Sequence, residues 1–400
     1  MRKKICFPTE KAKRRTQPAE CIAALPFAAV FALFIALSPL PAAKSVFTLG
    51  ALAAEKEISG LGTGSIANPT FGAGGWSYVY FGTYEGTPVK YRVLAKSTSE
   101  FGERSMLLDC DSTLCSMPYE AGFVPLTPTA RAGVGWENSA VRAFLENDFY
   151  RESFTPQERA AVSSSVKSDF CRDGRGKEYL GTQELTGEHV FALDAKEATR
   201  ASYGFSSVCA DSDTRIKRGA DAWWWLRSPD ISGSLLTGKV TYYGGIYNNL
   251  VRPVIGVSPA CNIRLSSVIF SSVVSGGYKL TIRDADMFAR AETCTRTKDT
   301  VTVPYAVSAG TDRVSVLVTD GAYTPGMETP PRVKYYGALV TGDDKLKATG
   351  TGVFTLPAGY AAATDRIYIL AEKTSGSDKL TDYAALSAPL VLTVNRNAQG

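Results

Sequence analysis

The sequence predicts a mixed α+β domain followed by an all-β, immunoglobulin-like sandwich. Between residues 76 and 277, segments of alternating apolar and polar residues surround segments that have helical periodicity and helix-capping residues. Beyond about Gly277, short alternating segments recur every ~10 to 15 residues between Gly, Pro and Asp turns, which is typical of an antiparallel sandwich. A chain of 400 residues is also long for one domain.

Residues 1–53 are predicted to be a signal peptide or an N-terminal anchor. The basic stretches MRKK and KAKRR precede an apolar run from Cys21 to Leu37, and the triplet at 51–53 has the small-x-small form of a cleavage site. The apolar run is at the lower limit for spanning a bilayer, so membrane attachment through this uncleaved segment stays open. We therefore expect a secreted or cell-surface protein.

The net charge of +5 resides in this leader. Residues 1–53 hold eight Lys or Arg side chains and two Glu, so they carry +6, and the rest, with 36 basic and 37 acidic groups, carries −1. No electrostatic case for nucleic acid remains, because such binding needs a basic surface.

Six cysteines follow the leader, an even number that predicts disulfides in an exported protein. A local link between Cys110 and Cys115 is one candidate pairing. A link between Cys171 and Cys209 is another, and the sequence does not choose among the alternatives. Zinc is less favoured, because the chain has no CxxC pair and one histidine. The candidates are Cys110, Cys115, Cys171, Cys209, Cys261 and Cys294.

Local patterns predict the elements in order. Residues 54–75, rich in Gly and Ser, are predicted to be a linker. YVYFGTYEGTPVKYRVLA has the pattern of a β-hairpin, and SMLLDC follows as a strand. Asn138 or Ser139 can cap a helix through Phe149, and Thr155-Pro156-Gln157-Glu158 has the form of a capping box. A third short helix is expected after Asp194-Ala195-Lys196-Glu197.

Short strands are predicted from Trp223 onward, beginning with WWWLRS, GKVTYY and GGIYNN. Residues 278–396 are interpreted as the sandwich, although they show no Cys-Trp-Cys arrangement and true immunoglobulin kinship is not implied.

Several segments, taken in order, resemble the motifs of an uncharacterised family of exported bacterial proteins with a domain of unknown function. They are VYFGTYEGTPVKYRVLA, LLDCD, GWENSAVRAFLENDFY, FTPQERAAV, HVFALDAKEA, WWWLRSP and IGVSPACNIRLSS, and they cover about residues 76–272. That family is similar to the C-type-lectin-like fold, which also includes formylglycine-generating enzymes. The resemblance therefore implies a C-type-lectin-like domain over residues 76–277. The family usually has an arginine where this chain has Ser258, so no role is carried over for that arginine.

The three tryptophans raise a choice between core and binding surface. In a strand, Trp223 and Trp225 point one way and Trp224 the other. We expect Trp224 and Trp225 to be structural, with Arg227 paired to an internal carboxylate, because large aromatic residues are mostly buried. Trp223, beside a turn, is the candidate for an exposed platform.

The stretch after WWWLRSPD has the composition of a binding loop. Tyr gives a large contact with little loss of entropy, and Asn adapts its hydrogen bonds. Such residues also suit short hairpins, so a structural alternative stays open. The candidate ligand-binding residues are Trp223, Asp230, Tyr242, Tyr243, Tyr247, Asn248, Asn249 and Arg252.

No cofactor is predicted. A calcium-loop spacing runs from Asp109 and Asp111 to Glu120, but Leu114 stands where the loop needs glycine. Asp211 and Asp213 form a second acidic cluster, which is interpreted as a solvated turn.

Catalysis has little support in the sequence. His189, the single histidine, stands at the entrance to an apolar strand and is interpreted as structural. We expect a non-catalytic protein that recognises a protein or glycan ligand outside the cell. The alternatives are an enzyme of the formylglycine-generating or carbohydrate-active type and a structural envelope protein.

Overall fold

The computed structural model describes residues 58–98, 104–120, 135–168, 171–172, 178–179, 184–230, 235–341 and 346–394. The predicted leader and residues 54–57 of the predicted linker lie outside this set. Within it, no helix is both long enough and apolar enough to cross a membrane.

The prediction of an α+β, C-type-lectin-like domain is wrong. Strands make up 47% and helices 12% of the structure. The helical segments are short, and strands rich in β-branched and aromatic residues, which pack well on a pleated surface, make up most of the regular structure.

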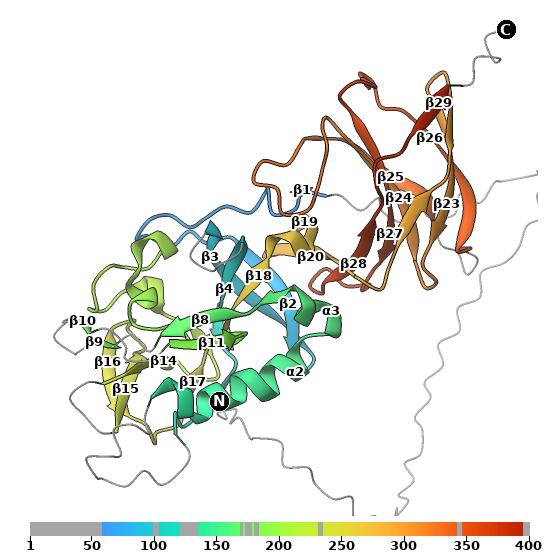
Figure 1. Cartoon of the computed structure of the whole chain (residues 1–400). Coiled ribbons are helices and arrows are strands. Elements are labelled where there is room, and N and C mark those ends of the chain that lie inside the picture. The colour runs from blue at the N-terminus through green and yellow to red at the C-terminus, as the bar shows by residue number, and fades with distance from the viewer. Residues whose placement is uncertain are drawn as a thin grey trace, which may run out of the picture. The chain divides into compact units, whose positions relative to one another are not determined.

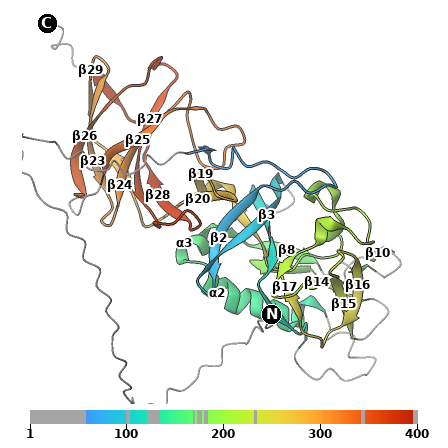
Figure 2. The ribbon, with the colours of Figure 1, turned by 180° about the vertical axis from the view of Figure 1, so that it is seen from behind.

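A sheet of 13 strands holds most of the described chain together (Figures 1 and 2). Its main path runs β12-β18-β4-β3-β2-β20-β28-β27-β24-β25, with β1, β7 and β19 paired off this path. Strand β20 lies parallel to both β2 and β28, so one sheet carries strands from both predicted domains. The strands are β1 (Gly60–Leu61), β2 (Tyr78–Tyr84), β3 (Thr87–Thr98), β4 (Ser105–Cys110), β7 (Val162–Ser163), β12 (Val190–Phe191), β18 (Ala260–Arg264), β19 (Val268–Val274), β20 (Gly277–Arg283), β24 (Arg313–Thr319), β25 (Val333–Thr341), β27 (Arg366–Lys373) and β28 (Asp382–Leu386).

A second sheet contains the tryptophan motif and has five strands in the order β16-β15-β14-β17-β6. Short two-stranded pairs surround it: β5 with β13, β8 with β11 and β9 with β10. The strands are β5 (Ser112–Thr113), β6 (Cys115–Met117), β8 (Ser165–Ser168), β9 (Cys171–Arg172), β10 (Glu178–Tyr179), β11 (Glu184–Glu188), β13 (Arg218–Gly219), β14 (Trp224–Pro229), β15 (Leu236–Val240), β16 (Ile246–Leu250) and β17 (Ile255–Val257).

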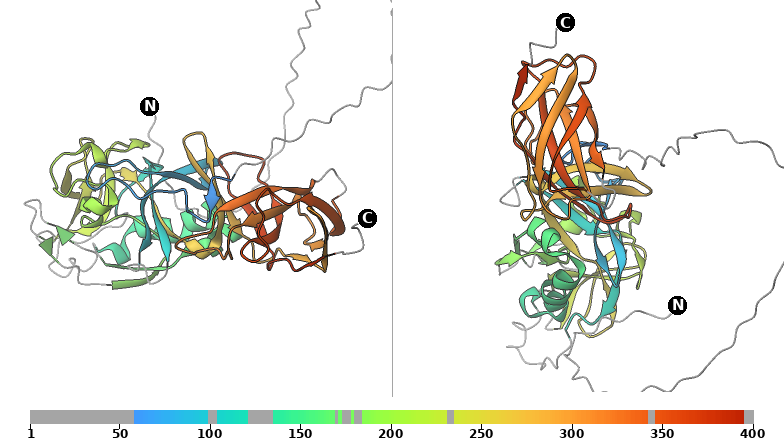
Figure 3. Two further views of the ribbon diagram at one scale, coloured as in Figure 1. Left: turned by 90° about the horizontal axis from the view of Figure 1, so that it is seen from above. Right: turned by 90° about the vertical axis from the view of Figure 1, so that its right-hand side faces the viewer.

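The C-terminal strands form two packed layers (Figure 3). Alternate residues of β23, such as Val301 and Val303, pack against Val314 and Val316 of β24 in one buried cluster. One layer belongs to the 13-stranded sheet, and the other is a sheet of β21 (Ala289–Ala291), β22 (Cys294–Thr297), β23 (Thr300–Val307), β26 (Thr349–Thr355) and β29 (Leu392–Val394).

The predicted helix starts are confirmed. Ser139 accepts a hydrogen bond from the backbone of Arg142, and Thr155 forms the full capping box with Glu158. The backbone N–H groups of Asp194 and Glu197 each donate to the carboxylate of the other residue, but a 3₁₀ turn follows instead of an α-helix. The helical segments are η3 (Trp136–Asn138), α1 (Ala140–Ala143), the π-helical η4 (Phe144–Phe149), α2 (Tyr150–Ser153), α3 (Pro156–Ala161), η5 (Glu197–Thr199), η6 (Ala201–Tyr203), η7 (Asp213–Arg215) and η8 (Leu265–Ser267).

The predicted β2–β3 hairpin is also confirmed. Its two turn residues, Glu85 and Gly86, have φ angles of 49° and 75°, and Tyr84 pairs with Thr87. Two consecutive positive φ angles are what a tight turn requires to match the twist of its strands.

Candidate functional site

Strand β14 buries Trp224 and Trp225 completely. Each indole N–H donates to a backbone oxygen, Trp224 to Arg215 at 3.1 Å and Trp225 to Met117 at 2.9 Å. The ring of Tyr119 meets that of Trp225 edge-on at 5.5 Å. These satisfied donors place both tryptophans in the core of the five-stranded sheet, as structural residues.

Arg227 lies buried in a network of charges. Its guanidinium donates to Asp194 at 2.8 Å and to Glu197 at 2.6 Å, and Lys167 binds Glu197 at 3.0 Å. Burial raises the pKa of Asp194 to about 6, against the attraction of Arg227. Burial would also raise the pKa of Glu197, but Arg227 and Lys167 outweigh it and lower that pKa. The network joins β8, β14 and the turn at Asp194 through buried ion pairs, so it stabilises this part of the chain.

The tyrosines lie on the hairpin formed by β15 and β16. The backbone of Thr241 donates to Gly245, and Gly244 donates back to Thr241, which closes the turn. Gly244 has φ 78°, and a Cβ there would lie 1.9 Å from the backbone oxygen of Ser212. A glycine is therefore required at this position, and the turn projects Tyr242 and Tyr243 outward.

Four aromatic rings and one lysine form a surface that we call the tyrosine face: Trp223, Lys239, Tyr242, Tyr243 and Tyr247. Tyr242, Tyr243 and Tyr247 are 46%, 57% and 49% exposed. Trp223 and Tyr242 are parallel within 4° with ring centres 6.2 Å apart, and the rings of Tyr242 and Tyr243 are 3.9 Å apart. Exposed aromatic residues gathered in this way are typical of a contact surface.

The remaining predicted binding residues divide between the two sides of the sheet. Asn249 follows Tyr247 by two positions in β16 and so shares its side. Asn248 points to the opposite side, where its amide donates to Asp230. Arg252 is exposed in the loop after β16.

Sequence reasoning missed Lys239, which pairs in register with Tyr247 on one side and Trp225 on the other. Its ammonium group lies 3.4 Å from the centre of the Trp223 ring. The available signal was the hairpin itself: centring the turn on TYYGG places GKV opposite IYN.

A second buried charge cluster was also missed. Lys217 donates to both carboxylate oxygens of Asp109, at 2.6 and 2.7 Å, and to the hydroxyl of Ser258 at 2.6 Å. All three side chains are almost completely buried. Ser258 thus accepts a hydrogen bond from a buried lysine that is also paired with Asp109.

Asp109 and Asp111 are committed to basic partners. Asp109 binds Lys217, and Asp111 binds Arg92 at 2.7 Å. Within the described ranges, no three acidic, His or Cys side chains gather in a way that could hold a metal ion.

Two of the proposed cysteine pairings do not form. Cys110 and Cys209 are thiols, as are Cys261 and Cys294, whereas Cys115 is disulfide-bonded. Cys110 lies in β4 of the 13-stranded sheet, and Cys115 lies in β6 of the five-stranded sheet. Burial raises the pKa of Cys110 to about 11 and raises that of Cys261 further. Neither thiol is therefore activated as a nucleophile.

His189 borders an open pocket of about 570 Å³ that Glu146, Tyr150, Arg151 and Arg159 also line. Its Nδ1 lies 3.2 Å from Glu146, and its ring stacks on Tyr150 at 4.6 Å. Glu146 also accepts hydrogen bonds from the backbone of His189 and Val190. These contacts fix the start of β12. No Ser, Thr or Cys is among the described residues that line the pocket, so a nucleophile for a Ser-His or Cys-His pair is missing from it.

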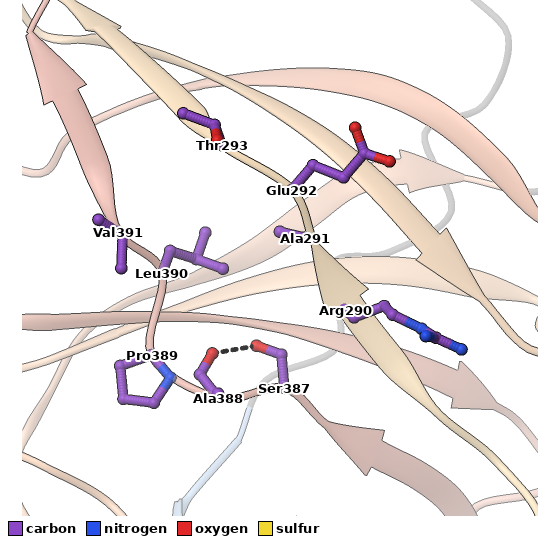
Figure 4. A pocket seen from close by; sticks show the side chains of 9 residues that line it. All are labelled: Arg290, Ala291, Glu292, Thr293, Ser387, Ala388, Pro389, Leu390 and Val391. Carbon is purple, nitrogen blue, oxygen red and sulfur yellow. Dashed lines mark hydrogen bonds between the residues drawn. The ribbon is translucent and has the colours of Figure 1, made fainter.

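A pocket of about 320 Å³ lies in the C-terminal part of the chain (Figure 4). The side chains of Arg290 and Glu292 both extend away from the segment that carries Leu390 and Val391 (Figure 4), and the hydroxyl of Ser387 donates to the backbone oxygen of Ala388 at 2.7 Å. Because its polar groups do not converge, this pocket lacks the feature that fixes a bound ligand.

Residues 126–265 match the family described as "Domain of unknown function (DUF6273)", so that domain covers β14, the hairpin and the tyrosine face. No curated protein matches the chain.

One solved structure, a β-glucuronidase from Ruminococcus gnavus in complex with C6-substituted uronic isofagomine, matches with 12% identity and a TM-score of 0.15. The match covers 74% of this chain and 47% of that one, and at this TM-score it carries no argument about fold or function.

Proposed function

We propose that this protein is a secreted or surface-exposed binding protein that recognises a protein or glycan ligand outside the cell, without catalysis, through the tyrosine face. The observation that carries the proposal is the exposure of three tyrosines on the β15–β16 hairpin, beside the partly buried Trp223. Binding surfaces favour Tyr and Trp, which give large contacts at a small cost in side-chain entropy.

The scaffold beneath the face supports this assignment. Trp224 and Trp225 are fully buried with their N–H groups satisfied, and Lys239 is held in register between Trp225 and Tyr247. A surface whose supporting residues are ordered before binding loses less entropy when the ligand arrives.

An export signal in residues 1–53 is part of the proposal and is supported by the basic, apolar and small-residue pattern of that segment. The C-terminal strands would then serve as a spacer. The alternative is a structural envelope protein, which would show no saturable binding of any ligand.

An enzyme is the other alternative, and its active site would have to lie at the pocket beside His189. A formylglycine-generating activity needs reactive cysteines, and the raised pKa values of Cys110 and Cys261 argue against these two as the reactive pair. A carbohydrate-active enzyme would need a pair of carboxylates. At this pocket, the carboxylate of Glu146 already contacts the backbone N–H groups of His189 and Val190 and the ring Nδ1 of His189.

The test is a screen of the full chain against protein and glycan arrays, repeated with Tyr242, Tyr243 and Tyr247 all replaced by alanine. We expect the variant to lose at least about tenfold in affinity, because buried aromatic contacts dominate binding energy. Its stability should change little, since all three side chains are about half exposed.

The matched control is Phe71→Ala, which removes an aromatic side chain that is 76% exposed and lies outside the face. It should leave binding unchanged. Equal binding by the wild type and the triple variant would refute the assignment of the site.

A further inference from the structure

Lys239 lies at the centre of the tyrosine face, and only 6% of it is exposed. In the described part of the chain its ammonium has one close contact, the face of the Trp223 ring at 3.4 Å, and no hydrogen bond or ion pair. The nitrogen is not among the polar atoms that are both enclosed and unsatisfied, so it keeps contact with solvent. A charged donor is thus recessed in the face and open toward whatever covers it.

The other buried lysines of the described ranges contrast with Lys239. Lys167, Lys217 and Lys279 bind carboxylates at 3.0, 2.6 and 2.8 Å. Burying an ammonium without a carboxylate is costly, which is why buried charges are normally paired.

The surroundings of Lys239 do not remove this cost. Burial lowers the pKa of Lys239, and Asp221 only partly opposes it. Asp221 accepts a hydrogen bond from the backbone of Trp223 at 3.2 Å. A carboxylate supplied by a ligand would therefore compensate a charge that the described residues leave without an ion pair.

We infer that the tyrosine face binds an acidic segment of a partner protein, with an Asp or Glu carboxylate of that segment on the ammonium group of Lys239. This inference rests on the proposed binding function and names the chemical class of the ligand. The hydroxyls of Tyr243 and Tyr247 can donate further hydrogen bonds to the same acidic segment.

A protein partner fits better than an acidic glycan for two reasons. A sugar ring would stack on an aromatic face, and the ammonium of Lys239 already covers one face of Trp223. The exposed tyrosines, Tyr242 and Tyr243 in the turn and Tyr247 in β16, also present apolar rings with polar hydroxyl tips, which is typical of protein interfaces.

The experiment measures binding of the full chain to three immobilised probes. The first is a peptide of alternating Glu and Ser, the second is the same peptide with Gln in place of Glu, and the third is polygalacturonate. The variants are Lys239→Met, which keeps the aliphatic chain over Trp223 but removes the charge, and Lys239→Arg, which keeps the charge. Lys373→Met, at an exposed position of β27, is the matched control.

We expect binding to the Glu peptide, weaker binding to the Gln peptide, and a loss of roughly 10- to 100-fold for Lys239→Met, because hydrogen bonds between charged groups contribute that much. Lys239→Arg should retain most of the affinity, and Lys373→Met should match the wild type. The melting temperature of each variant separates loss of binding from loss of fold.

Three results would overturn the inference: no binding to the Glu peptide, equal binding by Lys239→Met and the wild type, or binding to polygalacturonate alone. If the array ligand is lost in the triple tyrosine variant but retained in Lys239→Met, the tyrosine face stands as the site and only the acidic class falls. If the array ligand survives both sets of changes, the proposed function itself fails.

Discussion

Replacing Arg227 with methionine should lower the free energy of unfolding by about 3–5 kcal/mol, because it leaves Asp194 and Glu197 buried without their shared cation. Methionine preserves much of the side-chain volume, so the loss measures the missing charge more than a cavity. Urea denaturation followed by tryptophan fluorescence measures the change, since Trp224 and Trp225 lie in the same strand.

Arg332→Met is the control for Arg227→Met. Arg332 binds Asp320 at 2.7 Å, as short as the buried pair, but its side chain is 87% exposed. Exposed ion pairs contribute little because water screens them, so this variant should denature almost like the wild type. Similar losses in the two variants would contradict the assignment of Arg227 to a buried structural network.

The second large effect is expected for Lys217→Met, again about 3–5 kcal/mol, because Asp109 would remain fully buried without its ion-pair partner. The ammonium group of Lys217 also lies 4.2 Å from the centre of the Trp224 ring, so the change affects the core beneath the tyrosine face.

A double-mutant cycle separates the ion pair from the packing. Asp109→Asn combined with Lys217→Met should cost less than the sum of the single changes, because each single change already removes the pair. Strict additivity would mean that Lys217 and Asp109 do not stabilise one another.

Short-range features of this fold could be predicted from the sequence. The turn at Glu85 and Gly86 and the capping box of Thr155 and Glu158 depend on residues within a few positions of each other. Their side-chain and backbone requirements are local, so the residue types suffice to identify them.

Long-range pairing could not be predicted in the same way. Strand β20 joins β2 to β28 in one sheet, although about 200 residues separate β2 from β20 and about 100 separate β20 from β28. The alternation of apolar and polar residues within a strand gives no information on which strands become neighbours. The resemblance to a lectin-like fold led to a wrong prediction of an α+β domain.

The partners of the buried charged side chains could not be predicted either, because they are distant in the sequence. The calcium-loop spacing of Asp109, Asp111 and Glu120 is visible in the sequence, whereas the ion-pair partner of Asp109, Lys217, is 108 positions away. Lys239 was overlooked because its isolation becomes visible only when the described contacts around it are known.

The most direct test of the account is hydrogen–deuterium exchange of the full chain with and without the ligand that the array screen selects. The account predicts that protection on binding concentrates in β15, the Tyr242–Gly245 turn and β16. Protection confined to the segments around His189 and Tyr150, with the hairpin unchanged, would contradict the claim that the tyrosine face is the binding surface.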